Sequence, residues 1–118
     1  MHKIAIVVLS DPSQPAGLGL VVNALTAAKE FKENKDYVQV IFSGIGTQWL
    51  AELAKPDHLL HGTFNGLKDN IAGACGFCAA AFGATGDVKT CGVTVLEEYG
   101  TNMSYLHLVN DGYTVLTF

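Results

Sequence analysis

The chain has 118 residues, 49% of them hydrophobic and 15% charged, and a chain of this length provides one core and therefore one domain. Its net charge of −4 comes from 11 acidic residues against seven lysines, with no arginine. Nucleic-acid binders gather Lys and Arg on one face and use the guanidinium group for bidentate contacts, so this composition argues against a nucleic-acid partner.

The longest apolar run, Ile4 to Leu9, is cut off by Ser10 and is too short for a membrane-spanning helix, which needs roughly 18 residues. It is also too short for the apolar part of a signal peptide. We therefore expect no membrane segment and a cytoplasmic protein, in which thiols stay reduced unless they are used. The three cysteines, an odd number, argue against a secreted disulfide framework.

The first half of the chain predicts two strands and three helices. Residues 3–10 form a continuous β-branched run, typical of a strand that is buried on both faces of a parallel sheet. Apolar residues at helical spacing predict a helix over 18–33, and 36–42 has the pattern of a second strand. Shorter helices are predicted over 47–54 and 56–68.

The second half predicts three more strands. They cover 70–75, 91–98 and 113–118, and helices over 76–83 and 101–112 separate them. Strands that alternate with helices indicate an α/β fold, here a single domain over 1–118 with a mostly parallel five-stranded sheet covered on both sides. In such a sheet, ligands and chemistry gather at the carboxyl ends of the strands. The loops that follow the first three strands, 10–19, 43–48 and 74–78, are therefore the candidate sites.

Two familiar kinds of site are weakly represented. The run "GLGL" at 17–20 is half of a dinucleotide fingerprint, but the third glycine is missing, so no cofactor is expected. His61, Cys75, Cys78 and Cys91 satisfy the ligand count of a zinc site, yet Cys91 lacks a closely spaced partner. We therefore expect no metal, and we interpret Cys91 as a small buried hydrophobe.

The segment "GACGFCAAAFGA" places Cys75 and Cys78 three positions apart among small and aromatic residues. If the third strand ends near Cys75, both sulfurs lie at the first turn of the next helix, where unpaired N–H groups and the helix dipole favour a thiolate. Two interpretations stay open: a reactive thiol pair, or a pair of thiols buried in a core. We expect these two thiols to oxidise to each other before either pairs with Cys91.

The same segment resembles the DsrE/DsrF-like family, and within it the small single-domain proteins of the YchN-like type, which carry "CGxC" before a short helix. Here that motif is "CGFC" at 75–78, and the stretches 38–50 and 111–118 are similar to the family's second strand with its turn and to its last strand. The resemblance implies a flavodoxin-like three-layer α/β/α fold, assembly into homotrimers or hexamers, and transport of sulfur as a cysteine persulfide. Ile45 stands where many relatives have an acidic residue.

The leading hypothesis is a cytoplasmic sulfur carrier, in which one of Cys75 and Cys78 accepts sulfane sulfur from a donor protein and the other resolves or assists before the sulfur passes to an acceptor protein. The alternatives are a thiol–disulfide redox protein and an oligomeric binding module with buried thiols. "CAAA" matches Cys78 to the single cysteine of some relatives, whereas the position at the helix start favours Cys75. We expect a homo-oligomer, with Gly76, Phe77 and Trp49 as walls of the site.

Overall fold

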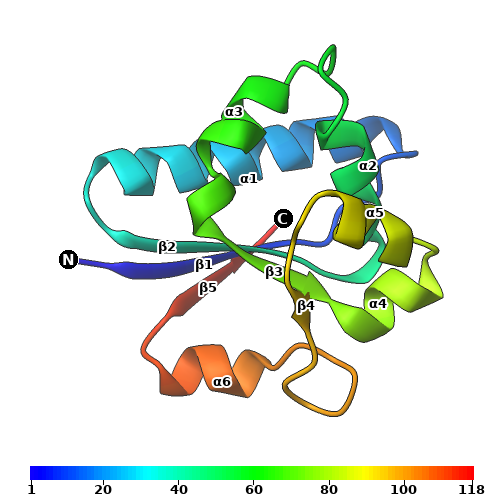
Figure 1. Ribbon diagram of the computed structural model, residues 1–118. Coiled ribbons are helices and arrows are strands. Elements are labelled where there is room, and N and C mark those ends of the chain that lie inside the picture. Colours follow the sequence, from blue (N-terminus) through cyan, green and yellow to red (C-terminus); the bar gives the residue numbers. More distant parts are fainter.

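The computed structural model describes residues 1–118 and contains one five-stranded sheet, in which every pairing is parallel (Figure 1). The order of the strands is β4-β3-β2-β1-β5. The strands are β1 (Lys3–Val8), β2 (Tyr37–Phe42), β3 (Ile71–Cys75), β4 (Val95–Leu96) and β5 (Thr114–Thr117). This confirms the predicted three-layer α/β/α fold of the flavodoxin-like type.

Six α-helices connect the strands. They are α1 (Pro15–Glu33), α2 (Trp49–Leu53), α3 (His61–Gly66), α4 (Gly76–Ala81), α5 (Thr85–Thr90) and α6 (Tyr105–Asn110), with 3-10 turns at η1 (Gly44–Gln48) and η2 (Lys68–Asn70). Figure 1 shows α1, α2, α3 and α5 on one face of the sheet and α6 alone on the other. No helix is both long and apolar enough to cross a membrane.

The two faces of the sheet bury separate apolar clusters, because successive side chains of a strand point to opposite sides. In β1, Ile4, Ile6 and Val8 pack with α1, while Ala5 and Val7 face the side of α6. The first cluster has 20 buried residues and the second has six, so the layer under α6 is much the thinner. The smaller cluster contains Cys75, Ile41, Met103 and Leu108, which brings one of the candidate thiols to this face.

The predicted strand over 91–98 is wrong in extent. Only Val95 and Leu96 pair with β3, and Cys91 caps the end of α5, a helix that the sequence pattern did not predict. α5 buries Val88 alone, so it has no apolar repeat from which to recognise it.

Two other predicted helices are shorter than expected. The helix over 56–68 begins only at His61. The helix over 101–112 begins at Tyr105, because Tyr99 and Asn102 close a turn before it and the Ser104 side chain caps its first amide groups.

Two glycines of α1 provide a test of the packing between the first loop and the helix. A Cβ at Gly17 would lie 1.9 Å from the carbonyl oxygen of Asp11, whereas a Cβ at Gly19 meets nothing within 4 Å. We predict that Gly17→Ala lowers the free energy of unfolding by about 1–3 kcal/mol, because the loop must move. Gly19→Ala on the same helix is expected to raise it by about 0.5–1 kcal/mol.

Urea unfolding followed by the fluorescence of Trp49, the one tryptophan, measures both free energies. Equal effects of the two substitutions would contradict the contact between Gly17 and Asp11.

Candidate functional site

Cys75 is the last residue of β3 and directly precedes the first turn of α4, as the sequence predicts. The turn is tight because Gly76 lies against β4: a Cβ there would stand 2.8 Å from Cγ of Glu97 and 2.9 Å from Cγ1 of Val95. The absence of a side chain at Gly76 therefore allows β4 to lie close to this junction. Cys78 follows in the first turn of α4, so one strand-to-helix junction holds both thiols.

The sulfur of Cys75 is enclosed by the loop between β4 and α6. The backbone N–H of Met103 donates to Sγ at 3.4 Å, and the thiol donates to Oδ1 of Asn102 at 3.8 Å. Cys75 is only 1% exposed. The loop therefore covers the thiol and supplies both a donor for a thiolate and an acceptor for a thiol.

Cys78 lies in a more open position. Its Sγ is 3.7 Å from Oγ of Ser43, the residue that follows β2, and its side chain is partly exposed. The carboxyl ends of β2 and β3 thus meet at the two thiols, as expected for neighbouring parallel strands.

The two thiols differ in acidity. Burial by itself raises the pKa of Cys75, but hydrogen bonds from the backbone N–H groups of Met103 and Cys78, and from the side chains of Cys78 and Ser43, bring that pKa below its usual value of 9.0. For Cys78, burial and the hydrogen bond of its thiol to Cys75 raise the pKa above 9.0, although Gly44 and Ser43 oppose this. Cys75 is therefore the more acidic thiol of the pair, and Cys78 is the less acidic one.

Tyr105, at the start of α6, also faces this site. Burial raises the pKa of its phenol, and negative charge at Cys78 and Cys75 raises it further, while a hydrogen bond with Ser43 acts in the opposite direction. No sequence pattern indicated Asn102, Met103 or Tyr105, which reach the thiols from a distant part of the chain. Ser43, in contrast, lies in the loop 43–48, which the strand pattern predicts as a candidate site.

The other sequence candidates lie elsewhere or play a different part. Trp49 is 2% exposed in the cluster under α1, and its indole N–H donates to the carbonyl and hydroxyl oxygens of Ser10 at 3.0 and 3.1 Å. Trp49 therefore packs in the core on the side of α1, opposite the cluster that contains Cys75, and its prediction as a wall of the thiol site is wrong. Phe77 does lie beside the thiols and is 50% exposed.

The structure does not bring the four possible zinc ligands together. Cys91 packs against the cluster on the α1 side, with its Sγ 3.6 Å from the carbonyl oxygen of Leu50, whereas Cys75 belongs to the opposite cluster. His61 uses its ring nitrogens on the carbonyl of Leu53 and the side chain of Asn65. No group of three or more His, Cys, Asp or Glu side chains is placed to hold a metal ion.

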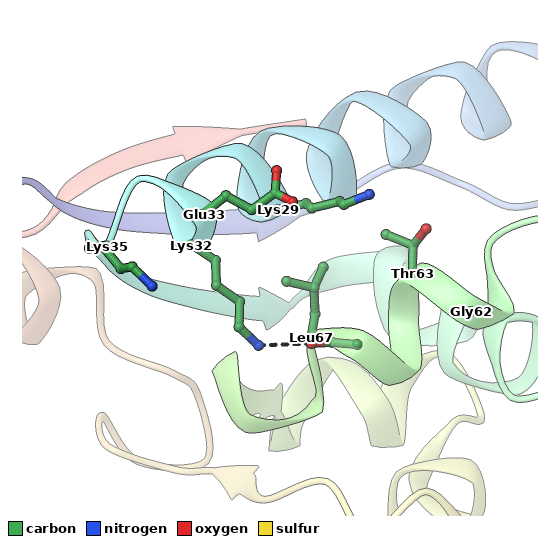
Figure 2. A pocket seen from close by; sticks show the side chains of 8 residues that line it. Lys29, Lys32, Glu33, Lys35, Gly62, Thr63 and Leu67 are labelled. Carbon is green, nitrogen blue, oxygen red and sulfur yellow. Dashed lines mark hydrogen bonds between the residues drawn. The ribbon is translucent and has the colours of Figure 1, made fainter.

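The surface hollows do not include either thiol of the pair. The largest, of about 510 Å³, lies between the end of α1 and α3, and Figure 2 shows Lys32 donating across it to the carbonyl of Gly66 at 2.8 Å. Another hollow, of about 350 Å³, is lined by the loop that covers Cys75 and by the start of α6. The candidate site is therefore the thiol pair itself, in which Cys75 is buried and Cys78 is partly exposed.

The fold and the site define the chain as an α/β protein with a paired-thiol junction at the end of its third strand. No protein-family model matches the chain. The uncharacterized protein MJ0733 of Methanocaldococcus jannaschii is 29% identical over 89 residues, which cover 74% of this chain and 72% of that protein. The solved structure of BT1422, a conserved protein of unknown function from Bacteroides thetaiotaomicron, aligns with a TM-score of 0.61 over 98% of this chain and 95% of that chain, at 15% identity. It supports the fold.

The hydrogen bond between the thiols predicts how substitutions change the acidity of Cys75. In a Cys91→Ser background, Cys78→Ala removes a donor to the Cys75 thiolate, so the pKa of Cys75 is expected to rise. Cys78→Ser keeps a donor at the same place and is expected to leave that pKa below the value in the alanine variant. The ultraviolet absorbance of the thiolate during a pH titration measures both values. Identical midpoints in the two variants would contradict the proposed hydrogen bond.

Proposed function

We propose that this protein is a cytoplasmic sulfur carrier that holds sulfane sulfur as a persulfide on its thiol pair. The observation that carries the proposal is the pair of free thiols at one strand-to-helix junction, where the backbone N–H of Met103 lies 3.4 Å from the Cys75 sulfur and hydrogen bonds lower the pKa of Cys75. A thiolate is the form of cysteine that attacks sulfur, and the protonated Cys78 beside it stabilises that form. Free thiols of this kind persist in the reducing cytoplasm.

The chemistry is a pair of sulfur transfers. The Cys75 thiolate attacks the outer sulfur of a donor persulfide, the sulfur–sulfur bond of the donor breaks, and the donor leaves as a thiolate. An acceptor thiolate then attacks the outer sulfur on Cys75 and restores the Cys75 thiolate. Where no acceptor is present, Cys78 attacks the inner sulfur, and the pair forms a disulfide as hydrogen sulfide leaves. Cys78 is thus the resolving thiol.

We also propose that the chain is a distant member of the DsrE/DsrF-like family. The "CGFC" motif at the end of the third strand and the parallel α/β fold support this membership. A second function, thiol–disulfide exchange with a partner protein, is favoured by the same difference in acidity between Cys75 and Cys78. The two functions differ in what the protein gains, one sulfur atom or one disulfide bond.

Intact mass distinguishes the two functions. After incubation with a persulfide donor, the reduced Cys78→Ser variant is expected to gain one sulfur atom, which a reductant removes, because it has no resolving thiol. The wild type and Cys91→Ser are expected to gain the same atom only transiently and then to lose two hydrogens as hydrogen sulfide leaves, and Cys75→Ser is expected to gain none. No gain in Cys78→Ser, under conditions that load a known carrier, would reject the sulfur-carrier function. A loss of two hydrogens in the wild type with no gain of sulfur in Cys78→Ser would favour disulfide exchange.

We further propose that copies of the chain assemble through the apolar surface beside the thiols. α6 leaves Leu106 and Val109 67% and 60% exposed at helical spacing, and Phe77 is exposed next to the thiol pair. α6 is the helix that lies alone on its face of the sheet (Figure 1). Because soluble monomers rarely expose extended apolar patches, a second copy is the occupant that the family resemblance favours, as a trimer or hexamer.

Light scattering at micromolar concentration tests the assembly. The wild type is expected to have the mass of more than one chain, and Val109→Glu or Phe77→Asp to have a smaller mass, because each puts a charge into the interface. Leu59→Glu is a matched control, since Leu59 is 78% exposed and lies outside this patch, in the turn before α3. A wild type with the mass of one chain would reject the assembly.

A further inference from the structure

The loop that encloses Cys75 is itself a compact unit, and we call residues 99–103 the Cys75 cover. The N–H of Tyr99 donates to the carbonyl of Asn102 at 2.9 Å, and the N–H of Asn102 donates back at 3.0 Å. This reciprocal pair closes a tight turn. Because the turn is held by its own backbone, the cover is expected to move as one body rather than unravel.

Three contacts attach the cover to the thiol junction. Two of them end on the sulfur of Cys75: the N–H of Met103 at 3.4 Å and Oδ1 of Asn102 at 3.8 Å. The third joins the N–H of Phe77, in the first turn of α4, to the carbonyl of Thr101 at 2.7 Å. Two of the three hydrogen bonds that attach this loop therefore involve the sulfur of Cys75, one as acceptor and one as donor.

Both contacts to the sulfur depend on its chemical state. A thiolate is a strong acceptor for the N–H of Met103, and a thiol has a proton for Oδ1 of Asn102. A disulfide sulfur has neither charge nor proton, so both contacts weaken when Cys75 becomes oxidised. Met103 is only 5% exposed, and a buried N–H that loses its acceptor destabilises the closed arrangement.

We propose that the Cys75 cover is a redox-sensitive latch, closed while Cys75 is reduced and released when Cys75 and Cys78 form a disulfide. The oxidant is a disulfide of low molecular weight: its sulfur–sulfur bond breaks, the bond between Cys75 and Cys78 forms, and two thiols leave with the two electrons and the two protons. Release changes the surface over Cys75, where Tyr99 of the cover is 77% exposed, so a partner protein meets different surfaces on the reduced and oxidised forms.

The latch goes beyond the proposed function, because it concerns the oxidised form of the thiol pair rather than the transfer of sulfur. It rests on the proposed pairing of the two thiols and not on the transfer of sulfane sulfur. The two ideas are therefore separable: a protein that forms the disulfide and gains no sulfur from a persulfide donor loses the carrier function and keeps the latch.

Amide hydrogen exchange of the full chain tests the latch. Reduced protein is compared with protein oxidised by an excess of 2-hydroxyethyl disulfide, after peptide mapping has located the bond between Cys75 and Cys78. We expect the amide of Met103 to exchange at least about tenfold faster in the oxidised protein, since it loses a charged acceptor. The amide of Leu25, inside α1, is expected to exchange at the same rate in both forms.

Two variants make the result specific. Cys78→Ser cannot form the disulfide, so the same oxidant is expected to leave the exchange of Met103 unchanged. Asn102→Ala removes one attachment to the sulfur, so exchange of Met103 is expected to be faster already in the reduced protein and to change less on oxidation. Equal exchange at Met103 in reduced and oxidised wild type would overturn the proposal, and so would an equal acceleration by the oxidant in Cys78→Ser.

Discussion

The return of the chain from β4 to β5 governs the arrangement of this molecule. From β1 to β4, each strand is added next to the one before it on the same side of the sheet, and β5 then pairs with the other edge of β1. Right-handed crossovers keep the earlier helices on one face and oblige this last connection to cross the other. That is why α6 lies alone on its face (Figure 1) and why the loop before it passes the carboxyl ends of the strands, where it meets Cys75.

This crossing gives the two cysteines unlike surroundings although they share one turn. Cys75 points into the thin cluster under α6, where backbone N–H groups of the loop and of α4 stabilise its thiolate. Cys78 is closer to the surface, beside Ser43 and Tyr105, and its proton is held partly by the neighbouring thiolate. A buried, more acidic thiol beside a partly exposed, less acidic one is the physical basis of the proposed sulfur chemistry.

The loop that encloses Cys75 lowers the pKa of its thiol and also restricts the access of other molecules to its sulfur. The N–H of Met103 that lowers the pKa of Cys75 belongs to the same loop that covers the sulfur. Activation and shielding are therefore coupled through one backbone group. A site of this kind favours chemistry in which the loop responds to the state of the sulfur, because the sulfur is itself one of the groups that hold the loop.

The local sequence determined the class of fold and the position of the thiol pair. The β-branched run of β1, the helical spacing of α1 and the two cysteines at a strand-to-helix turn are short-range patterns, and each is present in the structure as predicted. Helix α5 was missed because one buried valine makes no periodic pattern. Trp49 was misplaced because the sequence cannot tell which face of the sheet a helix covers.

Only the tertiary structure decided which thiol is the more acidic. The groups that set the acidity of Cys75 include the N–H of Met103, 28 residues away along the chain, and Ser43 of another strand. A backbone N–H is present at every residue except proline, so no residue type marks the one that will meet the sulfur. Its place follows from the crossover that brings α6 beneath the sheet, and that is a property of how the strands are ordered rather than of any local run of residues.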